Sequence, residues 1–172
     1  NYKNATEKIP QFRDFFQMYQ LYMEAWEQIE RARYHHTRQE YGLAKEYYGK
    51  AAGIHRTLKQ WSYLALNYFA WSKLENAEDL SRKEKNEQAV QEFKQASALF
   101  SESETTLKDL SNKIENVDEK KLAIDLFKAA KIRHEYCAGR IVLEEAKILD
   151  KKGDHLLSSE KFGSAARAFK EI

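Results

Sequence analysis

Apolar residues near the start of the chain recur at alternating spacings of three and four, which places them on one face of a helix. The first such series is Phe12, Phe15, Tyr19, Tyr22, Trp26 and Ile29. It predicts a helix over residues 11–38, and less regular patterns predict helices over 42–57 and 60–82. The polar run 81–86 is expected to form a loop, with Asn86 as the N-cap of the next helix.

The most regular apolar series lies in the middle of the chain. Its members step by three and four without a miss: Phe93, Ala96, Phe100, Ser103, Leu107, Leu110, Ile114 and Val117. This heptad-like series predicts a helix over 87–117, followed by a helix over 119–151 that Asp118 caps. The two are expected to form a long antiparallel hairpin. A last helix is predicted from Asp154 onwards, with a break near 162–163.

Glycine and proline are scarce, and this scarcity supports an all-helical fold. The chain has six Gly and one Pro among 172 residues, whereas sheet architectures need frequent sharp turns that draw on both residue types. Gly153 follows a lysine pair and is the expected stop of the 119–151 helix. The predicted fold class is therefore all-α, built from antiparallel helix hairpins as one domain over residues 1–172.

Charge, cysteine content and hydropathy limit the kinds of partner and the cellular compartment that we expect. The 29 Lys and Arg residues nearly balance the 27 Asp and Glu residues, and both signs are interspersed, so we expect no nucleic-acid partner. No segment reaches the roughly 18 apolar residues of a membrane span, and the single cysteine, Cys137, cannot form an internal disulfide. We expect a cytoplasmic protein without a membrane partner and, because the chain starts at Asn1, a fragment of a longer protein.

A short pattern recurs four times: an alanine, an aromatic residue four positions later, and a small or apolar residue three positions after that. The copies are Ala44-Tyr48-Ala51, Ala89-Phe93-Ala96, Ala123-Phe127-Ala130 and Ala165-Phe169-Ile172, with start-to-start spacings of 45, 34 and 42. Twelve residues before each alanine stands another small residue, namely Ala32, Ala77, Ser111 or Gly153. Any helix bundle can present such a pattern on one face, so a general bundle stays open beside a repeat array.

This arrangement resembles the tetratricopeptide repeat family, whose period is about 34 residues, and the match is best over 28–54 and 149–172. The resemblance implies a right-handed superhelix of paired helices, here divergent and with a long central hairpin. It also implies a groove that binds a peptide or a partner domain. The groove would be lined by first-helix positions, which in this chain are Trp26, Ile29, Arg33, His36, Trp71, Leu74, Glu78 and Arg82. Within it, Arg33 and Arg82 are expected to bind carboxylates.

Aromatic side chains are concentrated at the N-terminal end. Sixteen of the 22 Phe, Tyr and Trp residues fall within residues 1–71. Large rings bury well both in cores and at interfaces. We therefore expect an aromatic core between the N-terminal helices, and in the alternative interpretation some of these rings line the groove.

Signatures of catalysis or metal binding are weak. The five histidines form neither an HExxH motif nor a Glu-x-x-His pair, and the chain has no GxSxG motif and no Walker lysine loop. His134 and Cys137, three residues apart, would supply at most half a zinc site. We therefore expect neither enzyme activity nor a cofactor.

Three functional hypotheses follow from the sequence. The first is a protein-interaction module, whose partner is a protein, a peptide or another domain of the same chain. The second is a structural bundle that forms homo-oligomers through the long hairpin acting as a coiled-coil arm. The third is a bundle that binds a metal ion or a small ligand through His134, Cys137 and nearby carboxylates.

Overall fold

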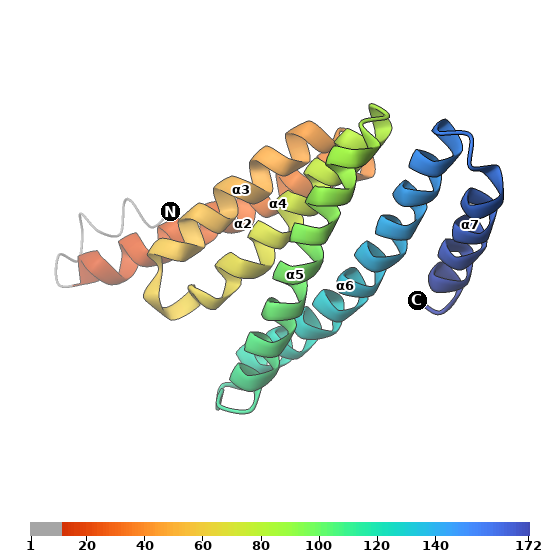
Figure 1. Cartoon of the computed structure of the whole chain (residues 1–172). Helices are drawn as coiled ribbons and strands as arrows, with labels where there is room; N and C mark the ends of the chain where they lie inside the picture. Colours follow the sequence, from red (N-terminus) through yellow and green to blue (C-terminus); the bar gives the residue numbers. More distant parts are fainter. Residues whose placement is uncertain (1–11) are drawn as a thin grey trace.

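The computed structural model describes residues 12–172, which form six α-helices and one short 3₁₀ helix (Figure 1). They are α2 (Arg13–Thr37), α3 (Tyr41–Thr57), η2 (Lys59–Trp61), α4 (Tyr63–Arg82), α5 (Asn86–Ser111), α6 (Val117–Lys151) and α7 (His155–Lys170). Each helix packs antiparallel against the next, and no strand occurs in this part of the chain. The prediction of an all-α fold of helix hairpins is confirmed. The predicted helix start at residue 11 lies outside the described residues.

The predicted long hairpin is present as α5 and α6, but its ends differ from the predicted ones. α5 ends at Ser111 rather than at residue 117, and α6 begins at Val117, which is 78% exposed. The cap of α6 is Asn116 and not Asp118. The Asn116 side chain accepts hydrogen bonds from the backbone N–H groups of Asp118 and Glu119, at 3.0 and 3.1 Å. An asparagine cap sets where a helix begins whatever the apolar spacing around it.

Two further local predictions are corrected. Asn86 lies in the first turn of α5 and does not cap it, because its side-chain amide donates to Glu144 of α6 at 2.6 Å. The helix α7 runs without interruption through Phe162 and Gly163. Nothing in this stretch forces a break, since a single glycine in a helix costs only about 1 kcal/mol against alanine.

The turns that close the hairpins α2–α3, α4–α5 and α6–α7 share one backbone geometry. Each places a left-handed residue two positions before the next helix, namely Gln39 (φ 59°), Glu84 (φ 55°) and Gly153 (φ 83°). Only glycine adopts this region without steric cost. The prediction that Gly153 ends α6 is confirmed, and this residue belongs to the turn rather than to the helix packing.

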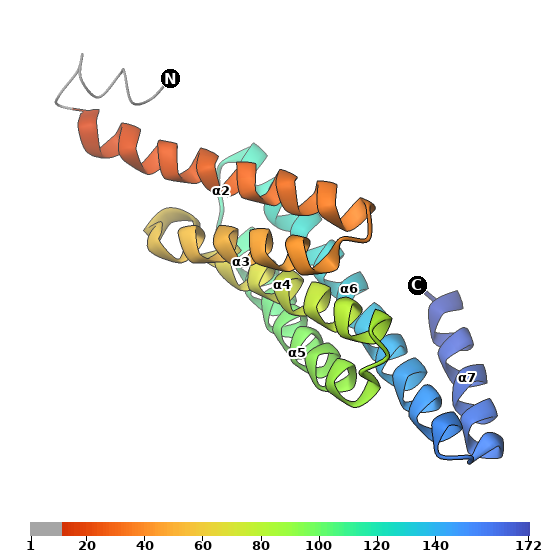
Figure 2. The ribbon, with the colours of Figure 1, turned by 90° about the horizontal axis from the view of Figure 1, so that it is seen from above.

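The shared turns reveal an internal repeat of three hairpins, which follow one another across the molecule from α2 to α7 (Figure 2). Six positions at fixed spacing are small or carry a ring. They are Ala25, Ala32, Ala44, Tyr48, Ala51 and His55 in the first hairpin, Ala70, Ala77, Ala89, Phe93, Ala96 and Phe100 in the second, and Gly139, Ala146, Ser158, Phe162, Ala165 and Phe169 in the third. All twelve small residues are buried. Residues at the same place in two hairpins are called equivalent below.

Two of the four predicted repeat copies, at Ala44 and Ala89, begin at equivalent places, and the other two do not. Ala123 lies inside α6 and starts no hairpin of its own. The last copy starts at Ser158 rather than at Ala165. Ser158 stands at the position where the pattern requires alanine, so the pattern did not identify the third copy.

Two buried clusters fill the space between the helices. The ring core lies between α2, α3, η2 and α4 and consists of Ile29, Ala32, Tyr48, Ala51, Ala52, Leu58, Trp61, Leu64 and Tyr68. The alanine core lies between α4, α5 and α6 and consists of Ala70, Leu74, Ala77, Ala89, Phe93, Ala96, Phe100, Ala130 and Cys137. The half-buried Trp71 packs against both. The expectation of an aromatic core between the N-terminal helices is confirmed.

A glycine of α6 lets an aromatic ring of α7 lie close to the α6 backbone. A Cβ atom placed on Gly139 would lie 2.8 Å from the Phe169 ring, which is nearer than carbon atoms approach without strain. Glycine at this position therefore lets the Phe169 ring rest directly on the α6 backbone. The equivalent residues of the other two hairpins are also small and buried, namely Ala25 and Ala70.

Candidate functional site

The first helices of the three hairpins, α2, α4 and α6, meet along one side of the molecule, which we call the first-helix face. His36 of α2 places Nδ1 2.7 Å from Oε1 of Glu75 on α4. Glu78 of α4 pairs with Arg140 of α6 at 2.9 Å. Because α3 and α5 separate these helices in the sequence, the face brings together side chains from three distant segments.

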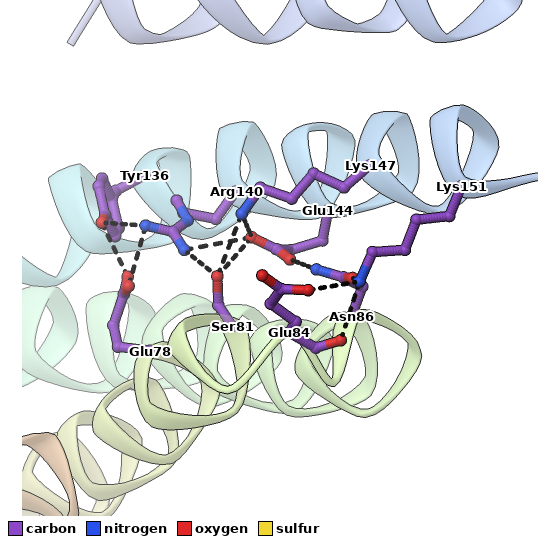
Figure 3. Close-up of polar contacts among 9 residues, drawn as sticks. All are labelled: Glu78, Ser81, Glu84, Asn86, Tyr136, Arg140, Glu144, Lys147 and Lys151. Atoms are coloured by element: carbon purple, nitrogen blue, oxygen red, sulfur yellow. Dashed lines mark hydrogen bonds and ion pairs between the residues drawn. The ribbon is translucent and has the colours of Figure 1, made fainter. Parts of the chain in front are cut away.

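Arg140 is the centre of a polar cluster between α4 and α6 (Figure 3). One guanidinium nitrogen lies 2.9 Å from Glu78 and 3.3 Å from the Tyr136 hydroxyl. The other donates to Ser81 at 2.9 Å and to Glu144 at 3.3 Å. Tyr136 in turn donates to Glu78 at 2.8 Å. A planar guanidinium presents several donors in fixed directions, so one arginine holds two carboxylates at once.

Glu144 is fully buried and gathers the other half of the cluster (Figure 3). It accepts hydrogen bonds from Ser81 at 2.7 Å, from Asn86 at 2.6 Å and from Lys147 at 2.7 Å. Lys151 donates to the side-chain oxygen of Asn86 at 2.8 Å. The cluster therefore ties α4, the start of α5 and the second half of α6 together.

Burial and hydrogen bonding act in opposite directions on the two carboxylates of the cluster. Burial, together with the nearby charges of Glu75 and Glu144, raises the pKa of Glu78 by more than Arg140 and Tyr136 lower it. Burial also disfavours the charged form of Glu144, but its hydrogen-bond donors, led by Lys147, outweigh this effect and lower its pKa. Glu144 is thus the fixed negative charge of the cluster, and Glu78 takes up a proton first as the pH falls.

A histidine–carboxylate pair, formed by His36 and the buried Glu75, links α2 and α4. Glu75 is fully buried, and its Oε2 atom has no hydrogen-bond partner within residues 12–172. The hydrogen bond to Glu75 raises the pKa of the half-exposed His36 by more than burial lowers it. The His36 ring also lies edge-on to Trp71, with 6.1 Å between ring centres. The imidazole therefore gains positive charge at a higher pH than a free histidine does.

Four of the eight predicted groove residues lie largely inside the protein. Ile29 and Leu74 are 0% and 2% exposed and belong to the ring core and the alanine core. Trp26 and Trp71 are half-buried, and each packs on a tyrosine of the ring core, with ring centres 6.3 and 5.4 Å apart. These four residues pack into or against the two cores and lie under the first-helix face.

The four polar members of the predicted groove are placed differently. His36 and Glu78 take part in the contacts described above. Arg33 is exposed and pairs with Glu30 of its own helix at 2.6 Å, whereas Arg82 donates to the backbone oxygen of Gln39 at 2.9 Å. No contact links these two arginines within residues 12–172.

The sequence reasoning missed the residues that α6 contributes to the face, above all Arg133. Its guanidinium carbon lies 4.7 Å from the centre of the Trp71 ring and 6.0 Å from that of Tyr136. It has no hydrogen bond or ion pair among the residues that the structure describes. The signal that could have found it is the copy at Ser158, because that copy makes α6 the first helix of a third hairpin.

The predicted metal-binding pair does not extend to a metal site. His134 Nδ1 lies 3.0 Å from both the backbone oxygen and the hydroxyl of Ser97. Cys137 is buried, and burial raises its pKa to about 12. No group of three His, Cys, Asp or Glu side chains that could hold a metal ion occurs within residues 12–172. In the same part of the chain, every helix is too short or too polar to cross a membrane.

Comparisons with protein-family models, curated proteins and solved structures find no match for this chain. Function is therefore inferred from the geometry and the charge of the first-helix face.

Proposed function

We propose that this chain is a non-catalytic interaction module whose first-helix face binds an acidic peptide or an acidic segment of a partner protein. The observation that carries the proposal is Arg133. It is a half-buried guanidinium stacked on Trp71, without a carboxylate partner among residues 12–172. A cation held in this way is available to an anionic group from outside the chain.

On the first-helix face the acidic side chains are buried more deeply than the basic ones. Glu75, Glu78 and Glu144 are 0%, 8% and 0% exposed, and each bonds an imidazole or a cationic side chain. The cationic side chains lie nearer to solvent, and the Lys147 side chain is 35% exposed. An incoming acidic segment therefore meets positive charge before it meets these carboxylates.

The geometry of Arg133 suits a carboxylate. The Arg133 guanidinium lies over the Trp71 ring, and its N–H donors make no hydrogen bond within residues 12–172. A carboxylate accepts two parallel hydrogen bonds from the edge of a guanidinium. His36, which lies against the same tryptophan, adds a second positive charge when it is protonated.

The resemblance to tetratricopeptide repeat proteins supports the same function. Stacked helix hairpins of this kind create extended surfaces that hold a partner segment. In this chain the conserved spacing of small and aromatic residues in three hairpins is in keeping with that architecture.

Labelled peptides test the proposal. We would measure fluorescence anisotropy with a labelled peptide of alternating Glu and Leu residues, and with a second peptide in which Lys replaces Glu. We expect the acidic peptide to bind, the basic one not to bind, and the affinity to fall as salt is added. Arg133→Glu should weaken binding about tenfold or more, because hydrogen bonds to charged groups contribute about 1.5–3 kcal/mol each.

Arg31→Glu is the matched control, since Arg31 is an exposed arginine of α2 that pairs with Glu27 of its own helix at 2.8 Å. It should leave the affinity nearly unchanged. The double variant Arg33→Glu with Arg82→Glu tests the groove expected from the sequence, and we expect a smaller loss from it than from Arg133→Glu. Equal binding of both peptides, or full binding by a folded Arg133→Glu variant, would rule out the proposal.

A further inference from the structure

The ring at one repeat position is covered in two hairpins and uncovered in the third. Tyr48 and Phe93 are 3% and 0% exposed, whereas the equivalent Phe162 of α7 is 38% exposed. Tyr48 is covered because it stacks on Trp71 of α4, with 5.4 Å between ring centres. Phe93 is covered because the Arg140 guanidinium of α6 lies 4.9 Å above its ring. In both cases the cover is the first helix of the following hairpin.

At the opposite end of the row of hairpins, a side of α2 is left uncovered. Met23 of α2 is 51% exposed, whereas the equivalent residues Tyr68 and Cys137 are 2% and 0% exposed. Those two are buried because a preceding hairpin packs against α4 and α6. Within residues 12–172 no hairpin precedes α2. Within residues 12–172 two faces are thus left uncovered. One lies on α7, whose equivalents α3 and α5 are covered by the next hairpin, and the other lies on α2, whose equivalents α4 and α6 are covered by the preceding one.

We propose that these two faces bind each other between copies, so that α2 of one chain packs on α7 of another as α4 packs on α3 and α6 packs on α5. The residues that cover the ring internally, Trp71 and Arg140, are equivalent to Trp26 of α2. Phe162 of one copy therefore lies against Trp26 and Met23 of the next. Thioether and aromatic groups attract one another in addition to burying apolar surface.

Charges at the two faces fit this pairing. Gly53 and Phe69 line one groove between α3 and α4, and their equivalents in the pairing between copies are Arg167 of α7 and Glu24 of α2. Both side chains are exposed in the single chain. The pairing therefore places a cation of one copy opposite a carboxylate of the next.

One pair of like charge limits the strength of the contact. Internally, His36 meets Glu75 and Ser81 meets Glu144, both at 2.7 Å. The equivalent pair between copies is Asp150 and Glu30, and two carboxylates at this place repel one another. The self-association is therefore weak and depends on concentration. Since the two faces differ, the contact is head-to-tail and has no built-in limit at two copies.

Sedimentation equilibrium tests the pairing on the 172-residue chain. The average mass should rise above the 20.3 kDa of one chain as the concentration increases. Phe162→Glu and Met23→Glu should each keep the mass at 20.3 kDa at all concentrations. Their equimolar mixture should form a one-to-one dimer, because Phe162→Glu keeps its α2 face and Met23→Glu keeps its α7 face. Val117→Glu, at a 78% exposed site on the tip of the long hairpin, is the matched control and should associate like the natural chain.

A charge exchange gives a second, independent arm. Arg167→Glu should weaken the association, and adding Glu24→Arg on the same chain should restore it. The helical circular dichroism of each variant confirms that it is folded, and Phe162→Ser replaces Phe162→Glu if the latter is not. A monomer at every concentration, or a Met23→Glu variant that still associates with itself, would overturn the head-to-tail pairing. Peptide binding at the first-helix face is measured at dilutions where the chain is monomeric, so the two proposals fail separately.

Discussion

The ring core and the alanine core differ in how their buried polar atoms are satisfied. His55 is fully buried against Tyr68 of the ring core, and neither of its ring nitrogens has a partner within the residues that the structure describes. The Tyr68 hydroxyl has none there either. Beside the alanine core, the equally buried Glu144 accepts hydrogen bonds from four residues, one of which is Arg140. Arg140 engages two carboxylates, and within residues 12–172 only its Nε atom is without a partner.

The size of the packed side chains explains this difference. Rings stack face to face in the ring core, as His55 does on Tyr68 with 5.5 Å between ring centres. Large rings fill the space between the helices with carbon atoms and hold their polar atoms away from other helices. Small residues let helices approach closely, so that a short side chain such as Ser81 reaches Glu144 on the next helix at 2.7 Å. The ring core is stabilised by apolar burial. The region around the alanine core is stabilised by the close packing of its helices and by the pairing of opposite charges between them.

The largest effect is expected from breaking the polar cluster beside the alanine core. Arg140→Ala removes the cation shared by Glu78 and Glu144, which are 8% and 0% exposed. Leaving buried charge without its partner costs about 3–5 kcal/mol, and the free energy of unfolding should fall by that amount. Urea unfolding followed by circular dichroism measures the change.

The control for this experiment is a surface arginine. Arg31→Ala removes an ion pair whose two side chains are 54% and 58% exposed, and such pairs contribute about 0–1 kcal/mol. If both variants lose the same small amount, the cluster is not the main support of this region.

The next effect tests the ring core through pH. Burial lowers the pKa of His55 to about 4, whereas an unfolded histidine titrates near 6.5. Below about pH 6.5 the unfolded chain therefore takes up a proton that the folded chain refuses, and the free energy of unfolding falls until about pH 4. The loss due to His55 is about 3 kcal/mol. Urea titrations at pH 7 and pH 4 measure it.

Substitution separates this loss from that of the carboxylates. His55→Gln removes the titrating group, so the fall in stability between the two pH values should become smaller by about 3 kcal/mol. His155→Gln, which replaces a histidine of α7 whose side chain is 76% exposed, is the control for the loss of a histidine from the chain. An unchanged slope in the His55→Gln variant contradicts the prediction.

A pair of tyrosine substitutions gives the smallest and sharpest comparison. Tyr136→Phe deletes a hydroxyl that donates to Glu78 at 2.8 Å and should cost about 2 kcal/mol, because that acceptor is charged and buried. Tyr68→Phe deletes a buried hydroxyl without a partner in the described part of the chain and should be neutral or stabilising by up to about 1 kcal/mol. Thermal melts of the two variants suffice, and a shift in the same direction for both would contradict the distinction between the cores.

Much of the fold could be predicted from the sequence because apolar spacing decides which face of a helix is buried. The positions of the helices followed from that spacing, and so did the aromatic core. The end of α5 did not, because the spacing continues to Val117 by coincidence, while Asn116 sets where α6 begins. The third hairpin was missed because Ser158 stands where the other two hairpins have alanine.

The site was harder to predict than the fold. Arg33 and Arg82 were expected to act together, but Arg33 pairs with Glu30 on its own helix and Arg82 donates to the backbone of Gln39. The spacing of residues along the helix can reveal the first contact but not the second, because Gln39 lies 43 residues before Arg82. Arg133 became a candidate only through its position over Trp71. That contact joins residues far apart in the sequence, and without the third hairpin nothing in the pattern places α6 beside α4.

The position of Trp71 affects how the molecule unfolds. Its ring contacts His36 of α2, Tyr48 of α3 and Phe100 of α5, and Arg133 of α6 lies over it. A stack of hairpins that touch only in order can fray from its ends, one hairpin at a time. Here one indole packs against both cores, so the opening of either core removes contacts from the other. We therefore expect α2 to α6 to unfold as one cooperative unit and α7 to open before them.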